Sequence, residues 1–340
     1  MYPHFSLREY NTFGLDVAAA QVCVVHGLSS LEKLYKEGVF QNEKLIVLGG
    51  GSNVLFMDDY IEGLVLLIEN KGIYVSEESD GSVLVSIAAG EDWASFVSKM
   101  VVAGYYGVEN LSLIPGKVGA APMQNIGAYG VELKDVFVRL LAFDLQNGVL
   151  VEFERDDCDF GYRTSIFKAS LPNRYVILSV ELRLKKQAAL KLDYGTVKSE
   201  LEKMGATQPG IEDVSNAIIK IRRSKLPDPK ILGNAGSFFK NPVVHKLVFD
   251  GLKREFPDIV GYVEGPHTVK IAAGWLIEKA GWKGIRRGDA GVHEMQALVL
   301  VNYGKASGRD IYGLAMEIQY SVKQRFGVLL EPEVNFIGSV

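Results

Sequence analysis

The chain has 340 residues and a formal net charge of −4. A length of this order predicts two or three domains, at roughly 100–200 residues each. The acidic balance disfavours nucleic acid as a main partner, because phosphate binding needs a concentrated basic face. No signal-peptide pattern and no uninterrupted apolar run of about 18 residues occurs, so we expect a cytoplasmic protein without a membrane span.

Cysteine and histidine are too few and too scattered to indicate a metal site. Cys23 and Cys158 stand far apart and in no paired motif, which is typical of a reducing compartment. The five histidines show no His-x-x-x-His spacing. We therefore predict that the protein holds no metal.

The first seventy residues have the pattern of a small α/β unit. A helix is expected over 29–38, where Ser29 and Glu32 form a capping-box pattern and Gly38 marks the end. Strands are expected over 20–27, on both sides of the glycines in 44–56, and over 64–69.

From residue 72 to about 210 the pattern changes to short strands separated by turns. One helix interrupts them over 91–104, where apolar residues recur at helical spacing. The alternation indicates an antiparallel α+β arrangement. The expected strands are 82–90, 136–145, 149–154 and 175–186, and the apolar helix positions are Trp93, Phe96, Val97, Met100 and Val101.

A third segment follows residues 212–229, whose two prolines indicate a boundary. Helices are expected over 268–281, capped by Thr268 and ended by Gly281, and over 307–327. The longer helix has apolar residues at positions 311, 314, 318 and 322. A last strand is expected over 329–338.

Two segments are unusually rich in glycine. The first, "VLGGGSN" at 47–53, follows a strand but has Val54 where a dinucleotide-binding fingerprint requires glycine. The second, "IPGKVGAAPMQNIGAYG" at 114–130, brings backbone N–H groups close to any ligand, as anion-binding nests do. Two such loops suit a long ligand with a central pyrophosphate; two unrelated flexible loops are the alternative.

These two loops, together with "GYRTSIFK", "NAGSFFKNP" and "LEPEVNFIG", resemble the UDP-N-acetylenolpyruvoylglucosamine reductase family. The resemblance runs from "NTFGLD" near the start to the end of the chain. Its departures are small: Leu113 replaces a usual glycine, and Lys117 stands where small or polar residues are commoner. Neither departure removes a chemical group.

The resemblance implies an α+β fold, with a two-lobed FAD-binding module of the vanillyl-alcohol-oxidase-like type and a smaller α/β substrate-binding domain. The implied FAD lobes are 1–70 and 71–215, and the implied substrate domain is 216–327. A C-terminal strand within 328–340 is expected to return to the active site. We expect a monomer.

The implied reaction is NADPH-dependent reduction of a UDP-linked enolpyruvyl sugar to UDP-N-acetylmuramate, in peptidoglycan precursor synthesis. Non-covalent FAD would carry hydride from NADPH to the methylene carbon of the substrate. The residues that the resemblance assigns to FAD are Gly49, Gly50, Gly51, Ser52, Asn53, Ile114, Pro115, Gly116, Gly119, Gln124, Asn125, Gly127, Ala128, Tyr129 and Gly130.

Three residues receive catalytic roles by the same resemblance. Ser237 is expected to protonate the carbon next to the carboxylate, Arg163 to hold that carboxylate, and Glu333 to stabilise or protonate the intermediate. Each alone has an ordinary alternative: a turn serine, a surface ion pair and a solvated glutamate. The residues expected to bind substrate are Tyr162, Tyr194, Lys225, Asn241, Lys283 and Gln296.

Tyr194, in "LDYGTV", indicates the type of this family that keeps a tyrosine-bearing loop over the substrate. Two rival functions stay open at this point. One is an FAD-dependent alcohol oxidase of the same fold, although the first glycine loop has no histidine or cysteine to tether flavin. The other is a regulator that binds flavin or nucleotide without turnover, for which Arg163, Ser237 and Glu333 together would have no task.

Overall fold

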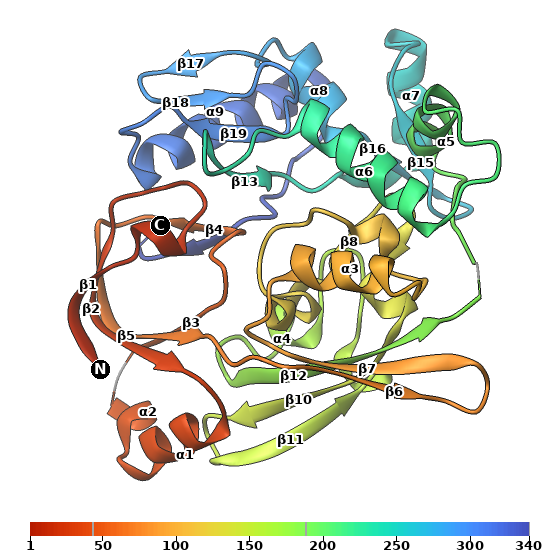
Figure 1. Cartoon of the computed structure of the whole chain (residues 1–340). Helices are drawn as coiled ribbons and strands as arrows, with labels where there is room; N and C mark the ends of the chain where they lie inside the picture. Colours follow the sequence, from red (N-terminus) through yellow and green to blue (C-terminus); the bar gives the residue numbers. More distant parts are fainter. Residues whose placement is uncertain (43, 188, 340) are drawn as a thin grey trace. The chain divides into compact units, whose positions relative to one another are not determined.

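The computed structural model describes residues 1–42, 44–187 and 189–339 (Figure 1). The chain divides into two compact units. The first unit comprises Met1–Phe5, Ala19–Gly51 and Glu62–Arg223, and the second comprises Ser6–Ala18, Ser52–Ile61 and Ser224–Val340. Within the described residues, no helix is both long and apolar enough to cross a bilayer.

The first unit contains an antiparallel five-stranded sheet in the order β11-β10-β12-β7-β6 (Figure 1). Its strands are β6 Ile73–Glu77, β7 Ser82–Ala88, β10 Phe137–Asp144, β11 Val149–Glu154 and β12 Tyr175–Lys185. Helix α3, Trp93–Val102, packs its apolar face into the same core as the buried residues of β7 and β12, as the helical spacing predicted. The side chain of Asp92 accepts from the Ser95 amide and caps that helix.

A second sheet has the order β1-β2-β5-β3, in which β3 and β5 are parallel. The glycine-rich loop at 49–51 follows the last residue of β3 directly. The bounds are β1 Tyr2–Ser6, β2 Ala18–Val25, β3 Leu45–Leu48 and β5 Tyr60–Ile68, and the short hairpin further on consists of β8 Gly127–Ala128 and β9 Val131–Glu132.

Helices and 3-10 turns connect these strands. Helices α5 and α6 pack around a small second core, against which Tyr129 and Leu192 also lie. The remaining helices up to residue 225 are α1 Leu28–Lys36, α2 Val39–Asn42, α4 Ile166–Ala169, α5 Gly195–Lys203 and α6 Ile211–Lys225. The 3-10 turns are η1 Arg8–Tyr10, η2 Glu109–Leu111, η3 Val118–Ala120, η4 Pro122–Gln124, η5 Leu133–Asp135 and η6 Asp156–Cys158.

The second unit contains a four-stranded sheet in the order β13-β19-β18-β17 and a three-stranded sheet in the order β14-β16-β15. In addition, β20 pairs in parallel with β4. The bounds are β4 Val54–Phe56, β13 Gly233–Ser237, β14 Val243–His245, α7 Lys246–Glu255, β15 Gly261–Val263, β16 Thr268–Ile271, α8 Ala273–Lys279, β17 Arg286–Arg287, β18 Ala290–Val292, β19 Val299–Asn302, α9 Gly308–Phe326 and β20 Asn335–Ile337.

The long helix α9 confirms its sequence pattern. The side chain of Ser307 accepts from the Asp310 amide, and Asp310 reaches back to the Ser307 amide in a capping box. The four predicted apolar positions are buried, and Gly327 closes the helix with a φ of 68°.

Two predicted helix starts are wrong. Helix α1 begins at Leu28 and has Gly27 as its N-cap, so the Ser29–Glu32 capping box does not form. The segment 268–281 is a strand followed by a shorter helix: Val269 and Ile271 are buried and their neighbours are not, which is the period of a strand. The expected C-terminal strand is also shorter, because pairing with β4 covers only Asn335–Ile337.

Candidate active site

Gly50 of the first glycine-rich loop and Gly116 of the second lie side by side within the first unit. A Cβ added at Gly50 would lie 3.1 Å from the Cα of Gly116 and 3.5 Å from the backbone nitrogen of Lys117. The backbones therefore approach so closely that a side chain at position 50 would crowd the facing loop. Such a backbone-lined cradle fits the pyrophosphate of FAD, which backbone N–H groups can bind without a cationic side chain.

Two backbone amides of the second loop already donate hydrogen bonds inside the protein. The Gly119 amide donates to the Ala89 carbonyl at 2.8 Å, and the Val118 amide donates to the Glu91 carbonyl at 2.9 Å. A Cβ at Gly119 would lie 2.5 Å from that of Ala89. Gly119 thus lets the loop pack onto the sheet, and its N–H is already used inside the protein.

The one cation in this loop is neutralised locally. The ammonium group of Lys117 lies 3.2 Å from a carboxylate oxygen of Glu69, and its side chain is largely buried. Lys71 also pairs with Glu69, at 3.4 Å. The unusual lysine at 117 therefore holds the loop to the end of β5.

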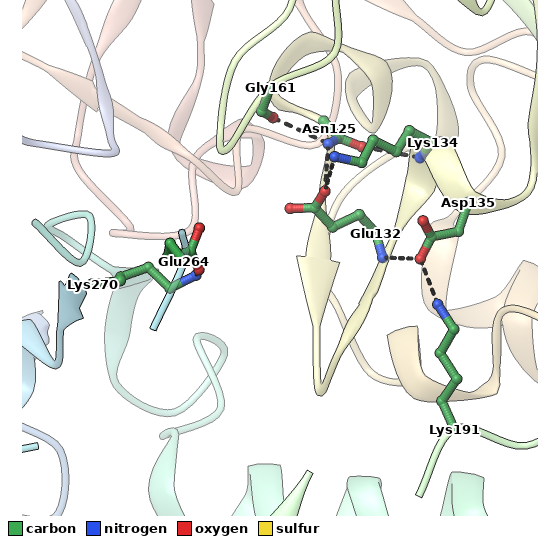
Figure 2. Close-up of polar contacts among 8 residues, drawn as sticks. All are labelled: Asn125, Glu132, Lys134, Asp135, Gly161, Lys191, Glu264 and Lys270. Carbon is green, nitrogen blue, oxygen red and sulfur yellow. Dashed lines mark hydrogen bonds and ion pairs between the residues drawn. The ribbon is translucent and has the colours of Figure 1, made fainter. Parts of the chain in front are cut away.

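Asn125 shapes the turn that leads to the β8–β9 hairpin (Figure 2). It is fully buried, with a left-handed φ of 44°. Its Nδ2 donates to Glu132 and to the Gly161 carbonyl, both at 3.1 Å, and its Oδ1 accepts from the Lys134 amide at 3.0 Å. The side chain of Asn125 thus connects the loop, the hairpin and the segment that carries Arg163.

Arg163 lies directly against that hairpin. Its Nη2 donates to the Gly127 carbonyl at 2.7 Å, and a Cβ at Gly127 would lie 3.1 Å from its Nη1. Its backbone has a φ of 56°, which is rare for a residue with a side chain, and its guanidinium lies 5.5 Å from the Tyr162 ring. The structure therefore brings a predicted catalytic residue next to a predicted cofactor residue.

Sequence reasoning missed Arg222, on the buried side of α6. Burial lowers the pKa of Arg222; the Tyr129 phenol, which hydrogen-bonds to it, acts in the opposite direction, and nearby Arg163 lowers the pKa further. Burial raises the pKa of the Tyr129 phenol. The signal in the sequence was an arginine four residues after Ile218, on the apolar stripe of a helix.

Tyr194 completes this group of side chains. Its ring meets the Tyr129 ring edge-to-face, with centroids 5.6 Å apart. Tyr194 is the N-cap residue of α5 and is 41% exposed. Arg163, Arg222, Tyr129 and Tyr194 therefore gather two cations and two phenols in one region of the first unit.

Ser237 stands at the end of β13, immediately after a bulge. The register shifts between Asn234, opposite Val301, and Ser237, opposite Val299, so β13 carries one extra residue. Gly236 takes a φ of 69° within it, and its amide donates to the Asn234 side chain at 2.9 Å. The bulge changes the direction of the strand at the residue before the serine.

Glu333 is held beside Ser237. The Glu333 amide donates to the carbonyl of Phe238 at 2.8 Å, and the Glu333 carbonyl accepts from Asn53 at 3.3 Å. Phe238 is fully buried in the second unit. Ser237, Glu333 and Asn53, which are remote in the sequence, are thus brought together, and the aromatic residue after the serine belongs to the core.

The predicted substrate residues of the second unit have defined local contacts. Asn241 accepts the Ala273 amide at the start of α8 at 2.9 Å. Gln296 accepts the Leu298 amide at 3.3 Å, Lys283 pairs with Glu278 at 3.1 Å, and Lys225 lies exposed at the end of α6. Across the described part of the chain, no group of three or more potential metal ligands is found.

Comparison with known proteins places these observations in a family. A model of an FAD binding domain matches residues 19–154, and a model of the C-terminal domain of UDP-N-acetylenolpyruvoylglucosamine reductase matches residues 228–337. The chain is 52% identical to the UDP-N-acetylenolpyruvoylglucosamine reductase of Pseudomonas aeruginosa, over 98% of this chain and 97% of that one. It is 47% identical to that of Flavobacterium johnsoniae, over 98% of both chains.

Structural comparison agrees with this assignment at the level of the fold. The reductase of the same name from Thermus caldophilus matches with a TM-score of 0.68 and 24% identity, over 98% of both chains. The predicted fold, an FAD-binding module with a separate C-terminal domain, is confirmed. The chain belongs to the UDP-N-acetylenolpyruvoylglucosamine reductase family.

Proposed function

We infer that this chain catalyses the reaction for which its relatives are named. It reduces the enolpyruvyl ether of a UDP-linked N-acetylglucosamine to the lactyl ether, UDP-N-acetylmuramate, with NADPH as the reductant. The close relation to named reductases over nearly the whole chain supports the substrate. The observation that carries the chemistry is the position of Ser237, after a glycine bulge and beside Glu333.

FAD fits the paired glycine loops, where Gly50 and Gly116 leave a cradle of backbone. Bound there, it supplies two-electron transfer, accepting hydride from NADPH and delivering it to the methylene carbon of the substrate. The residues proposed to hold it are those of the loops at 49–53 and 114–130. The internal hydrogen bonds of Asn125 support this proposal, because they fix the form of the second loop before any ligand binds.

Arg163 is proposed to hold the carboxylate next to the reacting carbon. Hydride addition to the methylene carbon leaves negative charge on the neighbouring carbon, and this charge spreads into the carboxylate. A guanidinium can meet a carboxylate with two parallel hydrogen bonds and neutralise that charge. Arg222 places a second guanidinium close to Arg163, and this proximity lowers the pKa of Arg222; an anionic ligand would relieve the repulsion between the two cations.

Ser237 is proposed as the proton donor to that carbon. An alcohol is a weak acid in water, but a carbanion beside a carboxylate is a strong enough base to take its proton. The bulge at Gly236 supports the role, because it directs the serine differently from a regular strand. Glu333 is proposed to stabilise the intermediate or to protonate it.

Lys225, Asn241, Lys283 and Gln296 are proposed to bind the uridine diphosphate part of the substrate. Tyr162 and Tyr194 are proposed as its aromatic contacts. Because it has Tyr194, we propose that this chain belongs to the type of the family with a tyrosine-bearing loop over the substrate. The exposed ring of Tyr194, just before α5, supports contact with a ligand. Tyr194→Phe is expected to weaken binding of the UDP-sugar more than it slows flavin reduction.

The test separates the two half-reactions in one cuvette. In Ser237→Ala, NADPH should still bleach the flavin. Reoxidation of the flavin by the enolpyruvyl sugar should slow by several orders of magnitude, because a general acid contributes a factor of about 10²–10⁴ to the rate. Ser170→Ala, at an exposed serine, is the matched control and should behave as wild type. Normal reoxidation in Ser237→Ala contradicts the role of the serine. A wild-type protein that binds no FAD contradicts the function.

A further inference from the structure

The turn Glu109–Leu111 is a buried polar segment between elements that carry site residues. Glu109, Asn110 and Ser112 are each at most 3% exposed. Buried polar side chains at this density need hydrogen-bond partners, and their partners show what the segment holds in place.

Asn110 joins two distant parts of the first unit. Its Nδ2 donates to the Tyr129 carbonyl at 2.9 Å and to the Lys191 carbonyl at 3.0 Å. Its Oδ1 is buried and finds no hydrogen-bond partner among the described residues. The side chain is therefore retained at a desolvation cost, which the two donated bonds must offset.

Tyr129 occupies a strained position that needs such support. It forms the tip of the β8–β9 hairpin with Gly130, and both have positive φ, 49° and 81°. Glycine and asparagine suit such a turn, whereas a tyrosine there is unusual. Tyr129 is held there by the hydrogen bond from Asn110, by the ring contact with Tyr194 and by the hydrogen bond with Arg222.

Lys191 is anchored both by its backbone carbonyl and by its side chain. Its carbonyl accepts from Asn110, and its ammonium group lies 2.9 Å from Asp135 (Figure 2). Burial acts to raise the pKa of Asp135, but hydrogen bonds from Lys191 and the Glu132 amide outweigh it, so that pKa lies below its usual value. Three residues further on, Tyr194 is the N-cap of α5. The segment before Tyr194 is thus fixed to the hairpin that carries Tyr129.

Ser112 extends the same arrangement to α6. Its Oγ lies 2.9 Å from the Oγ of Ser215, and both side chains are buried. Arg222 follows Ser215 by seven residues, which is two helical turns, and therefore lies on the same side of α6.

We propose that Asn110 is a positioning residue for this reaction. Its amide sets Tyr129 and Tyr194 relative to each other, so that the two rings form a preorganised aromatic corner for the UDP-linked substrate. The inference rests on the proposed function for the identity of that substrate. A residue that only stabilised the fold would lower the melting temperature without changing the behaviour of these two tyrosines specifically.

Asn110→Leu tests this, because leucine has nearly the same shape and cannot donate. We expect hydrogen–deuterium exchange of the holoenzyme to speed up by about tenfold in residues 189–198, where the Val197 amide donates to the Tyr194 carbonyl. The KM for the UDP-linked enolpyruvyl sugar should rise by about tenfold, while flavin bleaching at saturating NADPH keeps its rate. The KM effect of Tyr194→Ala should also shrink in the Asn110→Leu background.

Asn11→Leu is the matched control in the second unit. Asn11 is buried and its Nδ2 also donates to backbone carbonyls, to those of Leu7 at 2.9 Å and Leu15 at 3.0 Å and more weakly to that of Arg8 at 3.5 Å. It should lower stability without changing exchange at 189–198. If Asn110→Leu does not fold, Asn110→Ser, which keeps one donor, should show smaller changes in the same direction.

Unchanged exchange at 189–198, an unchanged KM, or strictly additive effects of the Asn110 and Tyr194 substitutions would overturn the positioning role. If the wild-type protein fails to reduce the enolpyruvyl sugar, the proposed function is wrong. The exchange experiment then still decides whether Asn110 holds the two tyrosine-bearing segments.

Discussion

The Glu333 amide donates a 2.8 Å hydrogen bond to the carbonyl of Phe238, the residue that follows Ser237. A backbone contact therefore holds a carboxylate near the end of the chain one residue away from the proposed proton donor. Because the contact uses main-chain atoms, it does not depend on the protonation state of the glutamate.

Gly236→Ala should slow turnover by disturbing the bulge before Ser237. A Cβ there meets nothing within 4 Å, so the cost comes from the φ of 69° and amounts to about 1–2 kcal/mol. If the serine moves by about 1 Å, substrate reduction should fall by about 100-fold, while flavin bleaching by NADPH persists. Stopped-flow absorbance measures both steps.

The matched control for this substitution is Gly327→Ala, at the end of α9. Its φ is 68° and it also has open space, so the backbone strain is equivalent. We expect a similar loss of stability with unchanged turnover. Equal losses of turnover in the two variants would show that strain alone, and not the position of Ser237, is responsible.

Gly50→Ala should weaken FAD binding, because the new Cβ crowds the backbone of Gly116 at 3.1 Å. Overpacking of this kind costs about 1–3 kcal/mol, which corresponds to roughly a 5- to 150-fold loss of affinity. Fluorescence titration of the apoprotein with FAD measures it. Gly313→Ala, in open space on α9, should leave FAD affinity unchanged; wild-type affinity in Gly50→Ala would contradict the proposed cradle.

Arg222→Met should separate stability from binding. Removing a buried guanidinium that lies near Arg163 relieves desolvation and repulsion, and we expect this relief to offset the loss of its hydrogen bond with Tyr129, so the melting temperature should stay the same or rise. The KM for the anionic substrate should increase by more than tenfold, because a charge-assisted contact worth about 1.5–3 kcal/mol is lost. A lower melting temperature with an unchanged KM would mark Arg222 as structural.

Acid unfolding should depend on Asp144, whose carboxylate is almost fully buried and lies 2.8 Å from Arg174. Burial acts to raise its pKa, but the bonds from Arg174 and the Gln146 amide outweigh it, so the pKa is lowered. A lowered carboxylate pKa contributes stability above the unfolded pKa of about 4, and this is lost as the pH falls through the folded value.

Asp144→Asn should therefore cost about 1.5–3 kcal/mol at pH 7, and the cost should shrink below about pH 4. Urea unfolding at a series of pH values gives this difference directly. A cost that stays constant from pH 7 to pH 3 would mean that the charge of Asp144 does not contribute.

The sequence correctly predicted those helices in which the apolar residues recur with a single, helical period. Helix α9 and helix α3 were predicted because their apolar residues recur at helical spacing; the structure adds the caps, Ser307 and Asp92. Residues 268–281 were misread because strand β16 runs almost directly into α8, and the amide at the start of α8 is bound by Asn241, which is distant in the sequence. A local pattern contains no information on such a cap.

The sequence proposes candidate site residues wherever a short motif contains them. Ser237, Arg163 and the glycine loops came from short specific segments, but the bulge at Gly236 and the contact between Glu333 and Phe238 depend on strand pairing. No motif assigned a role to Arg222 or Asn110. Their roles depend on what lies next to them once α6 and the hairpin have packed, and a linear sequence does not give this information.

The pairing of Lys117 with Glu69 has a consequence for how FAD binding responds to ionic strength. With that ammonium group neutralised inside the protein, the loop that we propose to hold FAD would attract phosphate through oriented peptide groups at short range, and such fields are screened little by dissolved ions. The dissociation constant for flavin should therefore change little between dilute and concentrated potassium chloride.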